Sequence, residues 1–421
     1  MLSTKLGLPQ MKGTLCFMLA AFIDALGSGI FSPFSLLYFK VIVGLSLPSI
    51  GLALSIAMMA TLIVIPITGI LVDHIGAKRV VIIAQILQGL GFFGYLIVTN
   101  FVTLVGFALL VTIGQSMFWS AYFTLVAEIG RPEERDRWYG LVNAVRISGI
   151  GLGGLLAGFV AAVLVNNAYH LVVIFNALSF FLAAGLVLFG VRASPRRNSG
   201  VPTLGYQAVV RDRPFLLLIV ANTCFALCSN FLYLAVPVYF TVALKIPIWF
   251  IGVTLAFNTV LIATMQTFVV RRLEPFKRTR ALMAAGGFWC TWCLASALAL
   301  FMPRFLLIPY LLVVVCLYGL AQMIHTPASN ALSALSSPEA LRGRYLAAFQ
   351  YSFFLANIVG PSLFTFLFTT HPALPWLAIA GIAVIGALVI YRIEPRLPGR
   401  ALWVREKTAS ESTVSTTLDE V

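Results

Sequence analysis

Two charged residues lie inside long apolar runs of the sequence. Asp24 is the only carboxylate well inside such a run, at residues 14–39, and Arg146 lies within another, at residues 138–165. If the first run is a membrane-spanning helix, Asp24 lies about 15 Å from its start, near the middle of a bilayer. A charge at that depth costs at least ~2.5–3.5 kcal/mol, so Asp24 must face a cavity or a partner. Two roles fit Asp24: a carrier of protons or binder of cationic substrate, or a static ion pair with Arg146.

Uncharged polar and aromatic residues form a second set of candidates. Gln115, Trp119 and Tyr122 recur at i, i+4 and i+7, which places them on one face of a helix. Other apolar runs carry Ser28, Asn222, Asn230, Tyr233, Gln322 and His325. For any single one of them, hydrogen bonding between helices or contact with lipid is an alternative to substrate binding. His325, which lies close to Pro327, also suits the capping of a bent helix.

The composition indicates that these residues lie in a membrane protein. Of the 421 residues, 60% are hydrophobic and only 10% are charged, and the mean hydropathy is +0.99. A soluble domain carries about 25% charged residues. The composition therefore excludes a soluble enzyme, a nucleic-acid binder and a secreted disulfide scaffold. The sequence predicts an all-α polytopic protein whose partner is the lipid bilayer. Its twelve helices are expected near 14–39, 49–72, 79–98, 101–128, 138–165, 170–191, 214–240, 248–270, 281–302, 305–332, 345–369 and 372–392.

The cysteines indicate neither a redox site nor a metal site. All six lie in apolar runs, and Cys290-Thr-Trp-Cys293 has no βαβ context around it. Buried small hydrophobic residues are the better interpretation. No metal and no cofactor are expected.

The distribution of basic residues predicts the orientation. Of the 28 Lys and Arg residues, 24 lie on the side of the N-terminus and three on the opposite side, and the last is Arg146. Cytoplasmic loops are enriched in Lys and Arg, so both termini are expected in the cytoplasm. The expected segments are a cytoplasmic N-terminus at 1–13, a six-helix bundle at 14–191, a cytoplasmic linker at 192–213, a second bundle at 214–392 and a disordered cytoplasmic tail at 393–421.

The two halves of the sequence resemble each other. A shift of 201 residues aligns Ala25-Leu26-Gly27-Ser28 with Ala226-Leu227-Cys228-Ser229, and Tyr38-Phe39 with Tyr239-Phe240. Later the shift becomes 206–207, where Arg135-x-Arg137 matches Arg342-x-Arg344. A duplicated six-helix unit with both copies in the same orientation suits alternating access, because two similar bundles can rock around a site between them.

One loop carries a family resemblance. Residues Gly69-Ile-Leu-Val-Asp73-His-Ile-Gly76-Ala-Lys78-Arg79 resemble the motif G-x-L-x-D-R-x-G-R-K/R-R of the major facilitator superfamily, with departures at His74 and Ala77. The resemblance covers the chain from the first helix to the twelfth. It implies that this loop latches the two halves together on the cytoplasmic side in the outward-open state.

Two helices resemble the drug:proton antiporter branch of that superfamily. The first is the helix with Asp24-Ala-Leu-Gly27 and Pro33, and the second is the fifth helix, with glycines at 149, 153, 154 and 158. The branch normally has Gly-Pro where Gly153-Gly154 stands here, whereas Gly360-Pro361 in the second half keeps the pair. The Arg that the branch often has in helix four is missing. The glycines Gly149, Gly153, Gly154 and Gly158 are expected to serve close helix packing, together with Gly360 and Pro361.

The resemblance also implies a site and a function. Helices one, four, seven and ten are expected to line a central cavity, which would bring the second set of candidates to a small-molecule substrate. Helices one and five are expected to be neighbours, which makes an Asp24–Arg146 pair feasible. The expected function is secondary transport of a small amphipathic or drug-like molecule across the cytoplasmic (inner) membrane, by a monomer, most simply as efflux coupled to proton antiport.

Three other functions remain open alternatives: an uptake carrier, a uniporter for another solute, and a non-transporting sensor on the same scaffold. An ATP-driven pump is disfavoured because no G-x-x-x-x-G-K-[ST] motif exists in the sequence. An intramembrane enzyme would need clustered catalytic residues, and a channel would need a filter-like loop.

Overall fold

The computed structural model describes residues 15–129, 135–163, 168–191, 206–338 and 341–403. Within these ranges all regular structure is helical, and twelve helical segments are long and apolar enough to cross a membrane. The predicted twelve-span, all-α fold is therefore confirmed. The expected N-terminus 1–13, most of the linker 192–213 and the tail beyond residue 403 lie outside the described residues.

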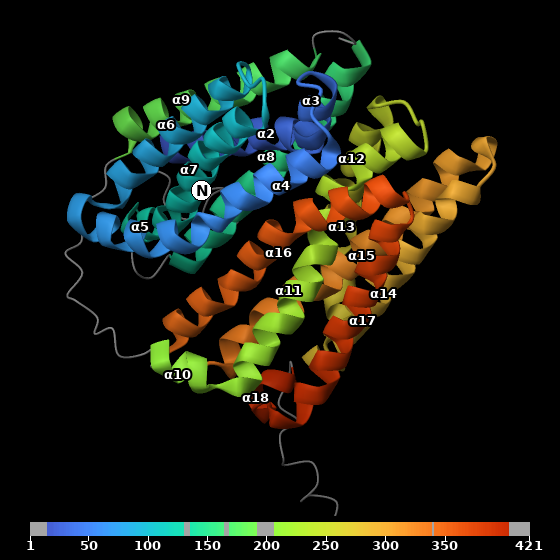
Figure 1. Ribbon diagram of the computed structural model, residues 1–421. Helices are drawn as coiled ribbons and strands as arrows, with labels where there is room; N and C mark the ends of the chain where they lie inside the picture. The colour runs from blue at the N-terminus through green and yellow to red at the C-terminus, as the bar shows by residue number, and fades with distance from the viewer. Residues whose placement is uncertain (1–14, 130–134, 164–167, 192–205, 339–340, 404–421) are drawn as a thin grey trace, which may run out of the picture.

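Six spans form the first half of the chain (Figure 1). They are built from α2 (Leu15–Phe31) continued by η1 (Ser32–Phe34) and α3 (Ser35–Val41), α4 (Leu47–Met59) continued by α5 (Thr61–Ile75), α6 (Ala77–Tyr95), α7 (Phe101–Ile129), α8 (Arg135–Val163) and α9 (Ala168–Gly190).

The second half repeats this order after the short helix α10 (Tyr206–Arg211). Its spans are α11 (Arg213–Leu234) continued by α12 (Val236–Val238) and η4 (Tyr239–Ala243), α13 (Trp249–Leu273), α14 (Arg278–Leu298) continued by η5 (Ala299–Phe301), α15 (Arg304–Ser336), α16 (Arg342–Thr370), and α17 (Leu374–Ile393) continued by η7 (Glu394–Arg396). The expected tail begins with ordered structure, because α18 (Gly399–Leu402) follows and Ala401 and Leu402 are buried.

Local residue types explain the breaks in these spans. Pro33 interrupts the first span, where a 3-10 turn replaces the α-helix, because proline lacks the N–H that an α-helix needs. Ser46 caps α4 by accepting a hydrogen bond from the Ser49 N–H. Gly76 separates α5 from α6 with a φ of +86°, a conformation that favours glycine.

The helix contacts within the two halves follow one pattern. In the first half α2 packs on α8 and α9, while α6 packs on α7 and α9. In the second half α11 packs on α16 and α17, while α14 packs on α15 and α17. The corresponding helices therefore make corresponding contacts. This agreement confirms the duplicated six-helix unit that the sequence shift predicted.

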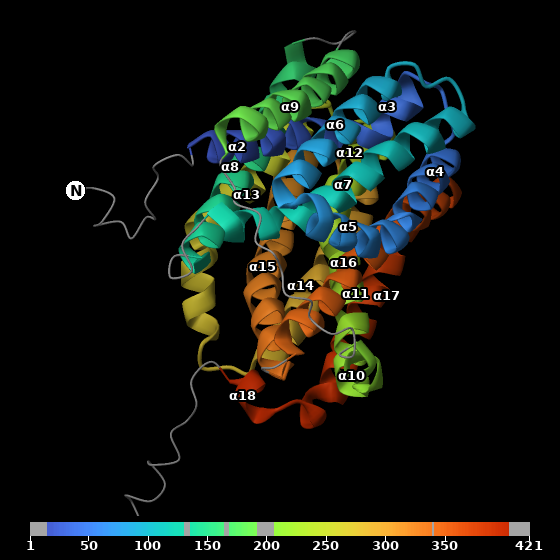
Figure 2. The same cartoon turned by 90° about the vertical axis from the view of Figure 1, so that its left-hand side faces the viewer.

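The two bundles contact each other through two pairs of helices, and the repeat relates one pair to the other. The contact of α4 with α16 corresponds to the contact of α13 with α8. The bundles lie close together at the end that carries α3 and α12 and diverge toward the end that carries α5 and α10 (Figures 1 and 2). Large apolar side chains such as Phe189, Phe301 and Val102 are exposed on the outside of the bundles, as lipid contact requires.

Candidate functional site

Asp24 and Arg146 form a buried ion pair between α2 and α8. Arg146 Nη1 donates a hydrogen bond to Asp24 Oδ2, and the two residues are only 8% and 3% exposed. Glycines on α8 allow this close approach. A Cβ on Gly149 would lie 2.8 Å from the Phe22 carbonyl oxygen, and a Cβ on Gly153 would lie 2.9 Å from Gly29 Cα.

Three aromatic rings from α7 surround the same guanidinium. Arg146 Cζ lies 5.2, 4.7 and 5.4 Å from the ring centroids of Phe118, Trp119 and Tyr122. A cation within about 6 Å of a ring face is attracted by its quadrupole. We call these three residues the aromatic cage. Trp119 and Tyr122, which the sequence suggested as cavity residues, thus lie beside Arg146 and are not part of the cavity lining.

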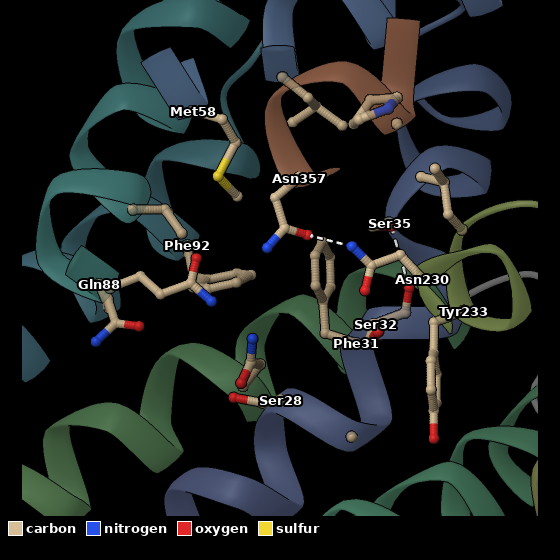
Figure 3. Close-up of a pocket in the computed structure, with 18 of the residues that line it drawn as sticks. Ser28, Phe31, Ser32, Ser35, Met58, Gln88, Phe92, Asn230, Tyr233 and Asn357 are labelled. Atoms are coloured by element: carbon tan, nitrogen blue, oxygen red, sulfur yellow. Dashed lines mark hydrogen bonds between the residues drawn. The ribbon is translucent and has the colours of Figure 1, made fainter. Parts of the chain in front are cut away.

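A cavity of about 480 Å³ lies between the two bundles (Figure 3). Four of the candidates, Ser28, Gln115, Asn230 and Tyr233, contribute to its lining. It is lined by Ser28, Gly29, Phe31, Ser32, Ser35, Leu54, Met58, Gln88, Phe92, Tyr95, Val111, Gln115, Ile150, Asn176 and Phe180 of the first half, and by Asn230, Tyr233, Leu234, Ala356, Asn357, Gly360 and Pro361 of the second.

The ion pair lies one helical turn from this cavity. On α2 the lining residue nearest to Asp24 is Ser28, four residues after it, and on α8 the lining residue is Ile150, four residues after Arg146. On α7 the lining residue nearest to Trp119 is Gln115, four residues before it. Four residues rise about 6 Å along a helix. On three helices, therefore, cavity-lining residues lie one helical turn away from the ion pair and its aromatic cage.

Asn222 and His325 lie in a separate polar network inside the second bundle. Asn222 Nδ2 donates to Ser352 Oγ at 2.6 Å, and Asn222 Oδ1 lies 3.0 Å from His325 Nε2 and accepts from Ser329 Oγ at 2.8 Å. All four residues are buried, and none lines the cavity. The shift of 206 that relates the halves places Ser352 opposite Arg146 and His325 opposite Trp119. The second bundle thus has a hydrogen-bonded network without a carboxylate or guanidinium where the first has the ion pair.

Span ten makes no contribution to this cavity among the described residues, although the resemblance implied that it would. Gln322 on α15 accepts a hydrogen bond from Ser229 Oγ at 3.0 Å and donates to Thr326 Oγ1 at 3.3 Å. The lining comes instead from spans two, three, five, six and eleven in addition to one, four and seven. Span eleven (α16) packs on span two (α4), and both of these helices contribute lining residues.

Three lining amides were missed by the sequence reasoning: Gln88, Asn176 and Asn357. Each is a polar residue in an apolar span, which is the signal that could have found them. They lie on spans three, six and eleven, which the resemblance did not mark as cavity helices.

The loop motif lies at the end where the bundles diverge. Asp73 is exposed in the last turn of α5 and makes no ion pair with any described residue, and Arg79 is also exposed. Lys78 Nζ donates a hydrogen bond to the Leu188 carbonyl oxygen, near the end of α9, at 2.8 Å. This bond joins spans three and six within one bundle. Gly69 has open space where a Cβ would be. In this conformation the loop does not link the halves through any described ion pair.

The other glycines of α8 face the second bundle. A Cβ on Gly158 would lie 3.1 Å from the Gly252 backbone nitrogen, and a Cβ on Gly154 would lie 3.5 Å from Leu255 Cβ. Gly360 and Pro361 line the cavity on α16, and the Pro361 carbonyl oxygen would lie 2.6 Å from a Cβ on Gly51 of α4. Both bundle-to-bundle contacts thus include a glycine on at least one side.

The described residues contain no group of three or more His, Cys, Asp or Glu side chains that could hold a metal ion. The arrangement offers a binding cavity between the bundles and an adjacent charged pair, which suits binding and proton exchange.

Comparisons with known proteins agree with this architecture. The family model described as Major Facilitator Superfamily matches residues 17–361. Relatives named "Multidrug resistance protein MdtH", from Yersinia enterocolitica serotype O:8 / biotype 1B and Photorhabdus laumondii subsp. laumondii, are 23% and 24% identical. The alignments cover 77% and 79% of this chain and 80% and 82% of the relatives. The crystal structure of the nucleoside transporter NupG has the same fold, with a TM-score of 0.74 at 13% identity over 91% of this chain and 99% of that one. The chain belongs to the Major Facilitator Superfamily, and it is a multi-pass membrane transporter and not an enzyme.

Proposed function

We propose that this protein is a secondary active transporter that exports small amphipathic or drug-like molecules across the cytoplasmic membrane in exchange for protons. The relatives named as multidrug resistance proteins support the substrate class. The cavity between the two bundles supports alternating access. The observation that carries proton coupling is the position of the Asp24–Arg146 pair, one helical turn from the cavity lining on α2 and α8.

In the coupling step Arg146 loses one of its two partners, the Asp24 carboxylate. In the conformation described here Arg146 pairs with the Asp24 carboxylate. A proton on Asp24 would remove that negative charge and break the pair, while the aromatic cage continues to hold the guanidinium. An unpaired buried charge is normally too costly to tolerate. The cage lowers that cost, so the pair is suited to opening and closing during a transport cycle.

We place both termini in the cytoplasm, following the bias of 24 basic residues to three. With that orientation the end closed by the α4–α16 and α8–α13 contacts faces outward. The conformation is then inward-open, and the cavity receives substrate from the cytoplasm.

The test uses the Asp24→Asn protein in inverted vesicles. An imposed pH gradient is used to drive the accumulation of a panel of amphipathic aromatic compounds in these vesicles. A neutral side chain mimics the protonated state, so gradient-driven accumulation should be lost while downhill exchange between preloaded and external compound continues. Asp212→Asn is the matched control, because Asp212 lies outside the spans and Asn also caps α11 well.

Full gradient-driven accumulation by Asp24→Asn would contradict coupling at this residue. Poor expression of Asp24→Asn, restored by adding Arg146→Gln, would instead assign the pair a structural role. Accumulation in the reverse direction under the same gradient would favour an uptake carrier.

A further inference from the structure

The cavity lining carries no charge. Among the described residues that line it there is no Asp, Glu, Lys, Arg or His, although five have side-chain amides and several have aromatic rings. The lining amides are Gln88, Gln115, Asn176, Asn230 and Asn357. A charged ligand would therefore lose its hydration on entering without meeting an opposite charge, which is costly.

The charged pair next to the cavity does not compensate a cation inside it. The Asp24–Arg146 pair, one turn away, has a net charge of zero, and its two charged groups point at each other. In the proposed coupling step, protonated Asp24 leaves Arg146 as a net positive charge next to the cavity, and a like charge repels a cationic ligand.

Asn176 is a hydrogen-bonding residue without a partner. It lines the cavity from α9, is 0% exposed, and neither its side-chain nitrogen nor its side-chain oxygen has a hydrogen-bond partner among the described residues. Gly27 on α2 makes room for it, because a Cβ there would lie 2.8 Å from Asn176 Oδ1. A buried unpaired amide costs free energy, which a ligand that offers both a donor and an acceptor would recover.

The amides on the other side of the cavity have unused capacity too. Asn230 Nδ2 donates to Asn357 Oδ1 at 2.9 Å, so the Asn230 oxygen and the Asn357 nitrogen make no further described hydrogen bond (Figure 3). The rings of Phe31 and Phe92 lie between Gln88 and the Asn230–Asn357 pair, and Tyr233 lies beyond Asn230. The cavity thus has hydrogen-bonding groups from both bundles and an apolar middle.

We propose that the cavity selects uncharged molecules that combine an aromatic body with a hydrogen-bond donor and acceptor, and that Asn176 binds this polar group. This inference rests on the proposed transport function and assigns the charge class of its substrate. Because the amides come from both bundles, a bound ligand contacts both of the halves that must move during transport.

Two dansylamides of nearly equal size test the charge preference. One carries N-(3,3-dimethylbutyl) and is neutral, and the other carries the isosteric N-(2-trimethylammonioethyl) and is a cation. Both keep the sulfonamide N–H donor and S=O acceptor. Binding of each to the purified full-length protein is measured by dansyl fluorescence. The neutral probe should bind at least about tenfold more tightly, the effect of a desolvated charge without a partner. Equal or tighter binding of the cation, or no binding of either probe, would overturn the inference.

Gln115→Glu tests the same point from the side of the protein. Gln115 lines the cavity with an exposed side chain, so a carboxylate there should be tolerated and should raise the affinity for the cationic probe by about tenfold or more. Asn330→Asp on α15 is the control, because it adds the same charge at an exposed position outside the lining. An unchanged probe preference in Gln115→Glu would contradict the assignment.

Asn176→Leu separates binding from structure. Replacing an unpaired buried amide with an apolar side chain should leave the melting temperature unchanged or higher, while affinity for the neutral probe falls about tenfold. Unchanged affinity would remove Asn176 from the binding site, and a lowered melting temperature would indicate a structural role.

Measurements of transport distinguish a failure of this inference from a failure of the proposed function. Flux of the cationic probe together with its tighter binding would overturn the inference and leave the transporter function standing. Selective binding of the neutral probe without any gradient-driven flux would overturn the proposed function alone.

Discussion

At the scale of single residues, Arg146 has two kinds of partner that attract it by different physics. The Asp24 carboxylate offers a full charge and a hydrogen bond. The aromatic cage offers three ring faces at 4.7–5.4 Å, which keep their attraction whether Asp24 is charged or neutral. The balance between these partners decides how costly it is to break the pair.

The cage should matter more when the carboxylate is gone. In a double-mutant cycle, Trp119→Leu should destabilise the Asp24→Asn protein by about 0.5–2 kcal/mol more than it destabilises the wild type, because the rings are then the main support of the guanidinium. Chemical unfolding in detergent measures both losses. Trp138→Leu is the control, since Trp138 is buried on α8 and is not one of the described rings over Arg146. Additive losses at Trp119 would argue against the cage.

The sequence predicted this pair only in part. The depth of Asp24 in an apolar run required a partner or a cavity, and the family resemblance made Arg146 a feasible one. The aromatic cage could not be predicted, because the helical spacing of Trp119 and Tyr122 defines a face of α7 but not its neighbour. Asn176 could not be assigned for the same reason: its role depends on Gly27 of another helix.

At the scale of helices, α8 uses its glycines on two sides. Gly149 and Gly153 approach α2 within the bundle, whereas Gly154 and Gly158 approach α13 of the other bundle. A helix with close contacts on both sides joins the internal structure of one half to the movable surface between halves.

These two faces should respond differently to an added methyl group. Gly153→Ala overpacks the α2–α8 contact and should cost about 1–3 kcal/mol of stability, seen as a lower melting temperature. Gly158→Ala acts between the bundles and should mainly favour their separation, seen as faster modification of a cysteine placed at buried Ser55 in the α4–α16 contact. Gly185→Ala is the control, because nothing lies within 4 Å of its added Cβ. Equal melting temperatures for Gly153→Ala and Gly185→Ala would contradict the close-packing role.

The turn between α5 and α6 gives the next prediction. Asp73 lies in the last turn of α5, where the helix dipole disfavours a negative charge, and it has no described ion-pair partner. Asp73→Asn should therefore keep or slightly raise stability in this conformation, by about 0.3–1 kcal/mol. If Asp73 binds the other half in the alternative conformation, transport should slow at the same time. Wild-type transport rates in Asp73→Asn would exclude the latch role.

The helices themselves were largely predictable, and their roles in the cavity were not. Apolar run length gave twelve spans whose ends differ from the structure by only a few residues, because a bilayer demands about 20 apolar residues. The tilt and crossing of α4 and α16 depend on tertiary contacts such as those of Gly51 and Ser55. The part that each span plays in the cavity, with span eleven in the lining and span ten outside it, follows from such tertiary packing and not from apolar run length.

At the scale of the whole molecule, the repeat determines how access can alternate. The repeat makes the α4–α16 and α8–α13 contacts equivalent to each other. Both contacts can therefore open together as the bundles rock. Both lie toward the end with α3 and α12, which is closed in this conformation (Figure 1).

A disulfide across one of these contacts should hold the closed end shut. Ser55 Oγ and Ser362 Oγ lie 2.8 Å apart, so cysteines at these two positions bring their sulfur atoms close enough to bond after small rotations. The six native cysteines lie elsewhere and are free, and the cross-link should therefore be specific to the double variant. Oxidation should stop transport, because α4 and α16 must separate to open that end, and dithiothreitol should restore it. Each single-cysteine variant, oxidised in the same way, controls for damage by the oxidant. Full transport by protein shown to be cross-linked on a gel would mean that these helices stay together throughout the cycle, and that the bundles move about some other contact.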